Sequence, residues 1–199
     1  MGNRVAIVAG LRSPYVKSGE DLKDVRPQDL GAMVLKELFL SKNIDPKWVD
    51  EVIVGNTGSP CDAVNISRVI ALNAGVPKET SCYTVHRNCA SGMQSIAEAY
   101  DKISSGTCHV VVAGGVESMS QMPLLFGKKM TDLFANLMKA KTPGQKLGIL
   151  SKFRPSFLTP TIAIVEGLTD PFCGLNMGQT AEKLALEFQI SRAEQDEFA

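Results

Sequence analysis

Short apolar runs alternate with amphipathic segments through the first 118 residues. Four such runs, at 4–10, 51–55, 81–86 and 109–115, have the length and residue types of buried strands. Between them, apolar positions recur at helical spacing in residues 27–41, 65–73 and 89–104. Strands that alternate with helices favour an α/β domain with a mostly parallel sheet that helices cover on both faces.

Local signals place the ends of these helices. Pro27 suits a first helical position, and the side chain of Asn65 can accept a hydrogen bond from the first turn of its helix. Gly75 is a typical helix stop. In the third helix, one face carries a run of apolar residues: Met93, Ile96, Ala97, Tyr100 and Ile103.

The pattern changes after residue 118. Residues 127–155 hold seven Lys or Arg against one acid, a net charge of +6, whereas residues 156–199 hold two basic and seven acidic residues, a net of −5. Within the basic segment, a helical stripe is formed by Met130, Leu133, Phe134, Leu137 and Met138. Residues 155–174 are expected to be irregular, and helices are expected around 178–188 and after a capping box of Ser191 and Glu194. That last helix is still running at Ala199, which predicts a chain that stops within a domain.

The overall composition is that of an ordinary globular protein. Lys plus Arg and Asp plus Glu number 21 each, so the net charge is zero and nucleic acid is a disfavoured partner. No stretch reaches the roughly 18 apolar residues of a membrane span. The first residues lack the apolar length of a signal peptide. Five cysteines without a CxxC pair favour neither disulfides nor zinc, and we expect a cytoplasmic protein without a metal.

The segment around Cys89 is the strongest candidate for chemistry. A strand runs into a tight turn, and Cys89 is expected in the first turn of the next helix, followed by the small residues Ala90, Ser91 and Gly92. The positive end of a helix favours the thiolate, the reactive form of cysteine. Free N–H groups there can also stabilise a developing oxyanion. A single cysteine is more often a small buried hydrophobe, which is our interpretation of Cys82 and Cys108.

Three segments resemble the thiolase family, which contains the 3-ketoacyl-CoA thiolases and acetyl-CoA acetyltransferases. They are Thr84–Gln94 (TVHRNCASGMQ), Ala113–Ser120 (AGGVESMS), and the pair MGQTAE at 177–182 with ISRxEQD at 190–196. They run through nearly the whole chain in the family's order. The resemblance implies a thiolase-like fold: an N-terminal core at 1–118 whose last strand is absent, and a partial loop domain at 119–199 inserted after the fourth strand.

The resemblance also implies a reaction. Thiolases cleave a 3-ketoacyl-CoA with CoA through an acyl-cysteine, or run the reverse condensation. Cys89 matches the nucleophile, and Met177 matches a residue that lines the substrate pocket, with core packing as its equal alternative. CoA is a co-substrate, and no cofactor is implied. His86 stands where the family often has Asn, and we assign it no role as a base.

Other residues of the family's site lie in a C-terminal half that this chain lacks. The catalytic His and the acid/base Cys are among them, so the 199 residues alone are expected to be close to inactive. Homodimers or tetramers are implied.

The basic insertion at 127–160 resembles the β-subunit of the trifunctional fatty-acid oxidation complex and its bacterial relatives. This implies a hydratase/dehydrogenase α-subunit as partner and contact with a membrane surface, and a mitochondrial location for a eukaryotic protein with its transit peptide removed. A solvated amphipathic helix is the alternative for this segment.

For the whole chain, the alternatives are a biosynthetic acetoacetyl-CoA thiolase, another Cys-dependent condensing enzyme, or a non-enzymatic fragment that docks a partner.

Overall fold

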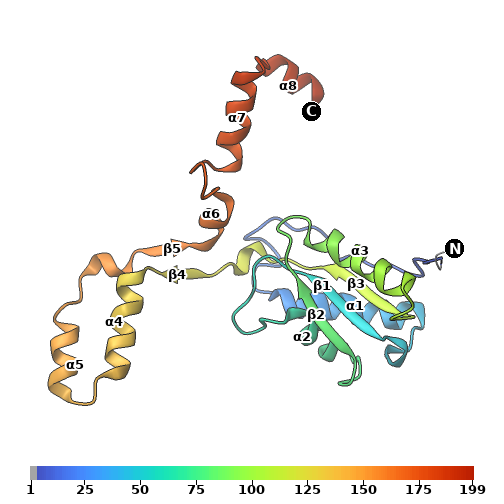
Figure 1. The fold of residues 1–199 in the computed structure, drawn as a ribbon, viewed down its shortest axis with the longest axis horizontal. Helices are drawn as coiled ribbons and strands as arrows, with labels where there is room; N and C mark the ends of the chain where they lie inside the picture. Colours follow the sequence, from blue (N-terminus) through green and yellow to red (C-terminus); the bar gives the residue numbers. More distant parts are fainter. Residues whose placement is uncertain (1–3) are drawn as a thin grey trace. The chain divides into compact units, whose positions relative to one another are not determined.

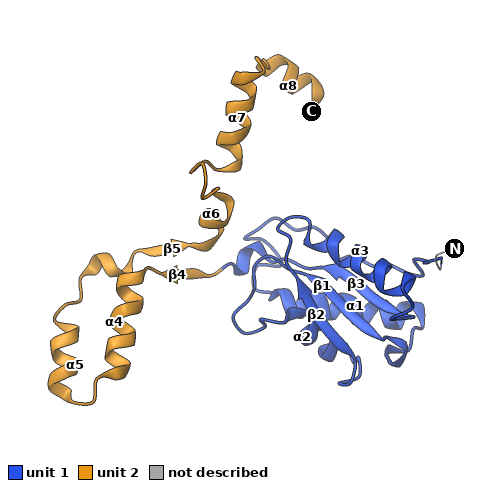
Figure 2. Cartoon of the chain, in the orientation of Figure 1, with its two compact units in different colours: residues 1–122 blue, residues 123–199 orange. Residues whose placement is uncertain are grey.

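The computed structural model describes residues 4–199, which form two compact units (Figure 2). The first unit ends at Met122 and the second begins at Pro123. The predicted boundary between residues 118 and 119, with its assignment to a core and an inserted domain, stays a prediction. Each unit is described by itself below.

A three-stranded parallel sheet forms the centre of the first unit. It consists of β1 (Glu51–Gly55), β2 (Ser81–Val85) and β3 (Val111–Gly115), in the order β2-β1-β3. Glu51 lies opposite Ser81 on one side and Val111 on the other. Every residue of the central strand β1 is buried. The expected parallel α/β arrangement is therefore confirmed.

Helices lie on both faces of this sheet (Figure 1). The connections from β1 to β2 and from β2 to β3 cross the sheet in opposite directions, so right-handed crossovers place α2 (Ile66–Asn73) and α3 (Ser91–Ser104) on opposite faces. Helix α1 (Pro27–Lys42) packs on α2. The short helix η1 (Pro46–Trp48) leads into β1, and η2 (Met119–Gln121) follows β3. Pro27 and Asn65 occupy the positions that the sequence predicts.

The main hydrophobic core lies between the sheet and the α1–α2 layer. Val52 and Val54 alternate with Ile53 along β1, so they face α1 and α2 while Ile53 faces the other side. The core contains eleven buried residues: Leu35, Phe39, Val49, Val52, Val54, Ala63, Ile66, Ile70, Ala71, Ala74 and Val76. Packing against the α1–α2 layer holds the strands in place, and the candidate site lies at the ends of these strands.

Helix α3 packs on the sheet through small side chains. Ser91, Ser95 and Ala99, spaced four residues apart, are its buried positions. Its apolar stripe faces outward instead, and the Met93 side chain is 69% exposed. Because the contact face is small, the helix backbone can lie close to the strands. The predicted apolar face of this helix thus exists, and Met93, Ile96 and Tyr100 on it are exposed.

The strand predicted at residues 4–10 is wrong. These residues have no regular secondary structure, and the side chains of Ile7 and Val8 are almost fully exposed. A strand needs a hydrogen-bonding neighbour, and among the described residues the sheet ends at β2 and β3. Residues 4–10 therefore have the composition of a buried strand, but residues 4–199 contain no strand that pairs with them.

The second unit is mainly helical. The strands β4 (Leu124–Phe126) and β5 (Pro160–Ile162) pair antiparallel, and between them lie α4 (Lys128–Lys139), α5 (Pro143–Leu150) and the short helix η3 (Pro155–Leu158). The helices α6 (Ala163–Leu168), α7 (Met177–Glu187) and α8 (Arg192–Phe198) follow. The expectation that 155–174 is irregular is wrong in part, because this stretch contains η3, β5 and α6.

Hydrophobic burial in the second unit is sparse. Its buried hydrophobic side chains are Met130 and Leu133, both on α4. Capping boxes begin three of its helices, at Thr142, Asn176 and Ser191. Within residues 4–199, none of the helices combines the length and apolar character needed to cross a membrane.

Candidate functional site

Cys89 lies in an exposed turn at the carboxyl end of the parallel sheet, where ligands bind in open α/β sheets. The turn, residues 86–90, connects β2 to α3. Helix α3 begins at Ser91 with Ala90 as its N-cap. Cys89 therefore precedes the helix by two residues rather than lying in its first turn, which corrects the predicted start of the helix at residue 89. The thiol still lies beside the positive end of the helix.

The turn has an unusual backbone conformation at Asn88. Its φ of 47° lies in the left-handed region, which Asn tolerates better than most residues. The buried Ser91 hydroxyl stabilises this turn from inside: it donates to the Asn88 carbonyl at 2.7 Å and accepts from the Arg87 N–H at 2.8 Å. The first residue of α3 thereby fixes the backbone on both sides of Asn88.

The loops that follow β1 and β3 meet at the same edge. Asn56 N–H donates to the Val85 carbonyl at 3.1 Å, and Val116 N–H donates to the Gly55 carbonyl at 3.0 Å. The side chain of Asn56 is only 2% exposed, and its amide donates to the Val116 carbonyl at 2.9 Å. The three strand ends are thus joined by hydrogen bonds behind the Cys89 turn.

Glu117 holds the loop after β1. Its carboxylate accepts hydrogen bonds from Thr57 N–H at 2.9 Å, Gly58 N–H at 3.2 Å and the Asn56 amide at 3.1 Å. Thr57 in turn donates from its hydroxyl to the Asn88 carbonyl at 3.2 Å. In the sequence, Glu117 stands out only as part of a motif, and nothing marks Asn56 or Thr57 as functional residues.

Glycines allow the close approach of α3 to the sheet. A Cβ on Gly55 would lie 2.3 Å from the Ser91 carbonyl carbon, and a Cβ on Gly115 would lie 3.1 Å from the Gly92 Cα. A side chain at Gly55 would therefore push the helix start away from β1. Gly92 is the residue after Cys89 whose backbone Gly115 approaches, although a Cβ on Gly92 itself would lie at an ordinary contact distance of 3.7 Å from the Gly115 Cα.

The five cysteines have different surroundings. Cys89, Cys61 and Cys173 are exposed, whereas Cys108 is buried and Cys82 is half-buried. Burial raises the pKa of the Cys82 and Cys108 thiols, which keeps them in the less nucleophilic protonated form. His86 is exposed in the same turn as Cys89, and among the described residues no hydrogen bond joins the two side chains.

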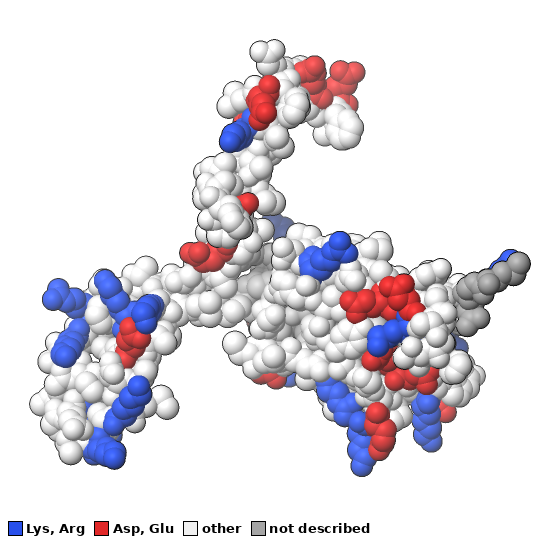
Figure 3. Space-filling model, in the orientation of Figure 1, with Lys and Arg blue, Asp and Glu red and all other residues white. Residues whose placement is uncertain are grey.

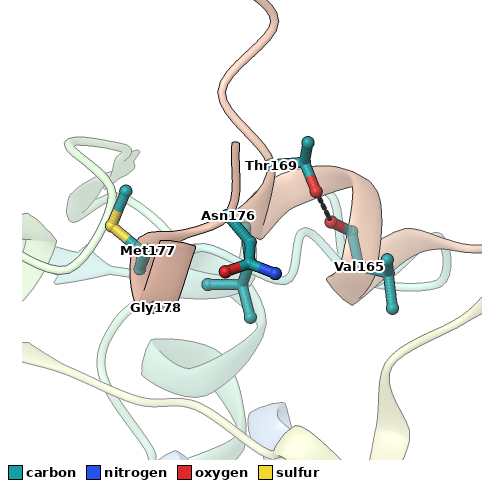
Figure 4. Close-up of a pocket in the computed structure, with 6 residues that line it drawn as sticks. Val165, Thr169, Asn176, Met177 and Gly178 are labelled. Atoms are coloured by element: carbon teal, nitrogen blue, oxygen red, sulfur yellow. Dashed lines mark hydrogen bonds between the residues drawn. The ribbon is translucent and has the colours of Figure 1, made fainter. Parts of the chain in front are cut away.

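Met177 lies in the second unit, beside a small apolar pocket (Figure 4). The pocket has a volume of about 240 Å³ and is lined by Val165, Leu168, Thr169, Asn176, Met177 and Gly178. Met177 is the first residue of α7, held by the Asn176–Gln179 capping box, and its side chain is 61% exposed. Two of the lining residues are joined by a hydrogen bond, which Thr169 donates to the Val165 carbonyl at 2.8 Å. That Met177 and Cys89 serve one site stays a prediction.

The basic segment, residues 127–155, carries its positive charges on α4, on α5 and on the stretches that follow these two helices (Figure 3). Its Lys and Arg residues are Lys128, Lys129, Lys139, Lys141, Lys146, Lys152 and Arg154. Apolar side chains are exposed among them, including Met138 and Leu147. Within residues 4–199, no three His, Cys, Asp or Glu side chains are grouped so as to hold a metal ion.

Comparisons with known proteins agree with these features. The family model described as "Thiolase, N-terminal domain" matches residues 5–199. The mitochondrial trifunctional enzyme subunit beta of Mus musculus is 41% identical over 98% of this chain and 40% of its own length. The 3-ketoacyl-CoA thiolase of Alteromonas mediterranea is 39% identical over the whole chain and 45% of its own length. The chain thus spans less than half the length of these curated relatives.

Solved structures give the same assignment. The acetyl-CoA acetyltransferase of Bacillus anthracis is 35% identical, with a TM-score of 0.72 over 90% of this chain and 41% of that protein. A thiolase from Ascaris suum, solved with coenzyme A, is 26% identical with a TM-score of 0.69 over 88% of this chain. The predicted fold is confirmed, and the chain belongs to the thiolase family, whose N-terminal domain it matches from residue 5 to residue 199.

Proposed function

We propose that the protein containing this chain transfers acyl groups between thiols, cleaving a 3-ketoacyl-CoA with CoA through an acyl-Cys89 intermediate. The observation that carries the proposal is the exposed Cys89 thiol on a hydrogen-bonded turn at the carboxyl end of the sheet. The names of the relatives support the substrate class, because they include 3-ketoacyl-CoA thiolases and an acetyl-CoA acetyltransferase.

The proposed reaction has two half-reactions. The Cys89 thiolate attacks the 3-keto carbonyl carbon, and the bond between C2 and C3 then breaks with its electrons passing to the leaving acetyl-CoA enolate. The enolate takes a proton, which releases acetyl-CoA and leaves an acyl thioester on Cys89. A CoA thiolate then attacks that thioester, forming the shortened acyl-CoA and returning Cys89 to its thiolate.

The residues that move protons in this scheme are proposed to lie outside the 199 residues. General acid–base catalysis is worth about 10²–10⁴-fold, so the 199 residues alone are expected to show little activity. Met177 is proposed to contact the acyl or thioester group, for which its flexible and polarizable side chain is suited. CoA acts as a co-substrate, and we propose no resident cofactor.

The basic α4–α5 segment supports a proposal about partners. Its exposed Lys and Arg side chains, next to exposed apolar residues such as Met138, have the character of segments that lie on anionic lipid. We propose membrane-surface contact here, a hydratase/dehydrogenase α-subunit as partner, and assembly as a homodimer or tetramer. The location is proposed to be cytoplasmic, or mitochondrial in a eukaryote.

A second candidate is a biosynthetic acetoacetyl-CoA thiolase, which is favoured by the similarity to the Bacillus anthracis acetyl-CoA acetyltransferase. The two candidates share Cys89 and differ in the substrate and direction. Comparing 3-ketoacyl-CoA thioesters of four and sixteen carbons distinguishes them, because only the degradative enzyme is expected to cleave the long one efficiently.

The test uses the longest natural polypeptide that contains these residues. Mixed with a 3-ketoacyl-CoA and CoA, it is expected to remove the keto-enolate absorbance in a CoA-dependent manner. Cys89→Ala is expected to abolish this activity, whereas Cys173→Ala, a change at another exposed cysteine, is expected to retain it. Full activity in Cys89→Ala, or no CoA-dependent cleavage by the unaltered protein, would refute the proposed function.

A further inference from the structure

We propose that Thr57 and Glu117 are positioning residues for the Cys89 nucleophile, a role that rests on the proposed function. Neither residue is adjacent to Cys89 in the sequence. Both reach the turn through hydrogen bonds that connect the ends of the three parallel strands.

The first step is the contact of Thr57 with Asn88. The Thr57 hydroxyl donates to the Asn88 carbonyl at 3.2 Å. The Asn88 carbonyl and the Cys89 N–H belong to the same peptide unit, which is planar and rigid. A donor that fixes the carbonyl therefore also fixes the direction of the Cys89 N–H and the position of its Cα.

The second step is the role of Glu117 in placing Thr57. Thr57 is exposed, whereas the preceding residue, Asn56, is buried and accepts a hydrogen bond from the Ser59 N–H at 2.8 Å. The Glu117 carboxylate accepts from the backbone N–H groups of Thr57 and Gly58 at 2.9 and 3.2 Å. Hydrogen bonds to an ionised carboxylate are about twice as strong as neutral ones. This carboxylate thereby holds the Thr57 backbone where its hydroxyl meets the turn.

The third step concerns Gly58, which permits the close approach of the loop to Glu117. A Cβ on Gly58 would lie 2.7 Å from the Glu117 Oε1 atom and 2.9 Å from the terminal methyl of Met122. A larger residue would displace the carboxylate from the loop. The Glu117–loop contact therefore depends on a close approach that Gly58 permits.

The turn needs such external support because of its backbone. Asn88 has a φ of 47°, a conformation that is less favourable for a residue with a side chain than the ordinary regions. The Ser91 hydroxyl supports this conformation from the helix side and Thr57 supports it from the loop side. The Asn88 carbonyl also accepts from the Ser91 hydroxyl at 2.7 Å and from the Ser91 N–H at 3.1 Å. Among the described residues, Thr57 supplies the hydrogen bond to this carbonyl that comes from outside residues 87–91.

The matched control is Thr80. Its hydroxyl donates to the Val49 carbonyl, also at 3.2 Å, at the opposite end of the same sheet. Thr57→Val and Thr80→Val each remove one threonine hydroxyl and one hydrogen bond of equal length. A merely structural role predicts similar consequences for both variants, whereas a positioning role predicts a kinetic effect only for Thr57→Val.

The experiment measures acylation of Cys89 by a 3-ketoacyl-CoA in single turnover, using the longest natural polypeptide that contains these residues. Thr57→Val is expected to slow acylation about tenfold with little change in KM, because small displacements of a reacting group have large kinetic effects. Thr57→Ser, which keeps the hydroxyl, is expected to restore the rate, and Glu117→Gln is expected to slow it. Thr80→Val is expected to leave it unchanged.

A second readout separates this inference from the proposed function. Alkylation of Cys89 by iodoacetamide is followed by peptide mapping, with the exposed Cys61 and Cys173 as internal references. Thr57→Val is expected to slow alkylation at Cys89 severalfold and to leave Cys173 unchanged. Wild-type rates of Cys89 modification in Thr57→Val would overturn the positioning role. Absence of acylation in the unaltered protein, with the alkylation difference retained, would overturn the proposed function alone.

Discussion

The two units of this chain are stabilised in different ways. The first has a core of eleven buried hydrophobic residues and hydrogen bonds between residues far apart in sequence, such as Asn56 with Glu117. Among its described residues, the second has only Met130 and Leu133 as buried hydrophobic side chains, and three of its helices, α5, α7 and α8, begin at capping boxes formed within four residues. The contrast shows that long-range packing and hydrogen bonds hold together the first unit, where Cys89 lies, whereas local contacts begin several helices of the second.

The largest effect is expected where helix and sheet backbones meet. Gly55→Ala would place a Cβ 2.3 Å from the Ser91 carbonyl carbon, so α3 must move. We expect a loss of about 3 kcal/mol in the unfolding free energy of the first unit, measured by urea denaturation. Gly114→Ala is the control in the neighbouring strand, because nothing lies within 4 Å of its Cβ. Equal stabilities for the two variants would contradict the close packing.

Breaking an ion pair is expected to cost more stability in the first unit than in the second. Lys102 Nζ lies 2.7 Å from the carboxylate of the buried Glu51 in the first unit. Lys102→Met leaves that carboxylate without its partner, and we expect a loss of about 2 kcal/mol, less than for a fully buried pair because the lysine is partly exposed. Lys128→Met breaks the exposed 3.2 Å pair with Asp132 in the second unit and is expected to cost less than about 0.5 kcal/mol. The checking measurement is denaturant unfolding of both variants, and a reversed order would show that burial does not govern these pairs.

Asp50 provides a smaller, pH-dependent test of the long-range contacts. Its Oδ2 accepts from His109 N–H at 2.7 Å and from Val110 N–H at 3.0 Å, just before β3. These backbone hydrogen bonds, that from Val110 foremost, lower the pKa of Asp50 below its usual value of 3.8. The stabilisation is therefore present above about pH 4 and is lost as the pH falls through the lowered pKa. Because the carboxylate is exposed, Asp50→Asn is expected to cost only about 0.5 kcal/mol at pH 7, and the difference should shrink in urea titrations as the pH falls below the usual pKa of an aspartate.

The smallest global effect is expected at a cap of the second unit. Ser191→Ala removes the hydroxyl that accepts from Glu194 N–H, so α8 should fray. Amide hydrogen exchange in residues 192–198 is expected to become faster, while the unfolding of the first unit stays unchanged. A shift of the first unit's unfolding midpoint would show that the two units are not independently stabilised.

The predictions from the sequence were correct where the structure depends on residues close together in the chain. Helices α1 and α2 begin where Pro27 and Asn65 predict, because capping depends on residues within one turn. The position of Cys89 between a strand and a helix was also predictable from the alternating pattern. Its distance from α3 was not, because the exact start of the helix depends on the Ser91 contacts with Arg87 and Asn88.

The failures concern partners distant in sequence. An apolar run such as Val5–Val8 predicts a strand, yet pairing requires a neighbouring strand that the run itself does not specify. Similarly, Thr57 and Glu117 are 60 residues apart, and only the fold brings them together behind Asn88. Periodicity indicates which face of an element is apolar and does not indicate what covers it, which is why the exposed face of α3 was not foreseen.

The most direct test of the central claim is peptide-level mass spectrometry after incubation of the longest natural polypeptide with a 3-ketoacyl-CoA in the absence of added CoA. We expect an acyl adduct on the peptide that contains Cys89 and none on those with Cys61 or Cys173, which are also exposed. An adduct that is absent from Cys89, or that is spread evenly over the exposed cysteines, would contradict that claim.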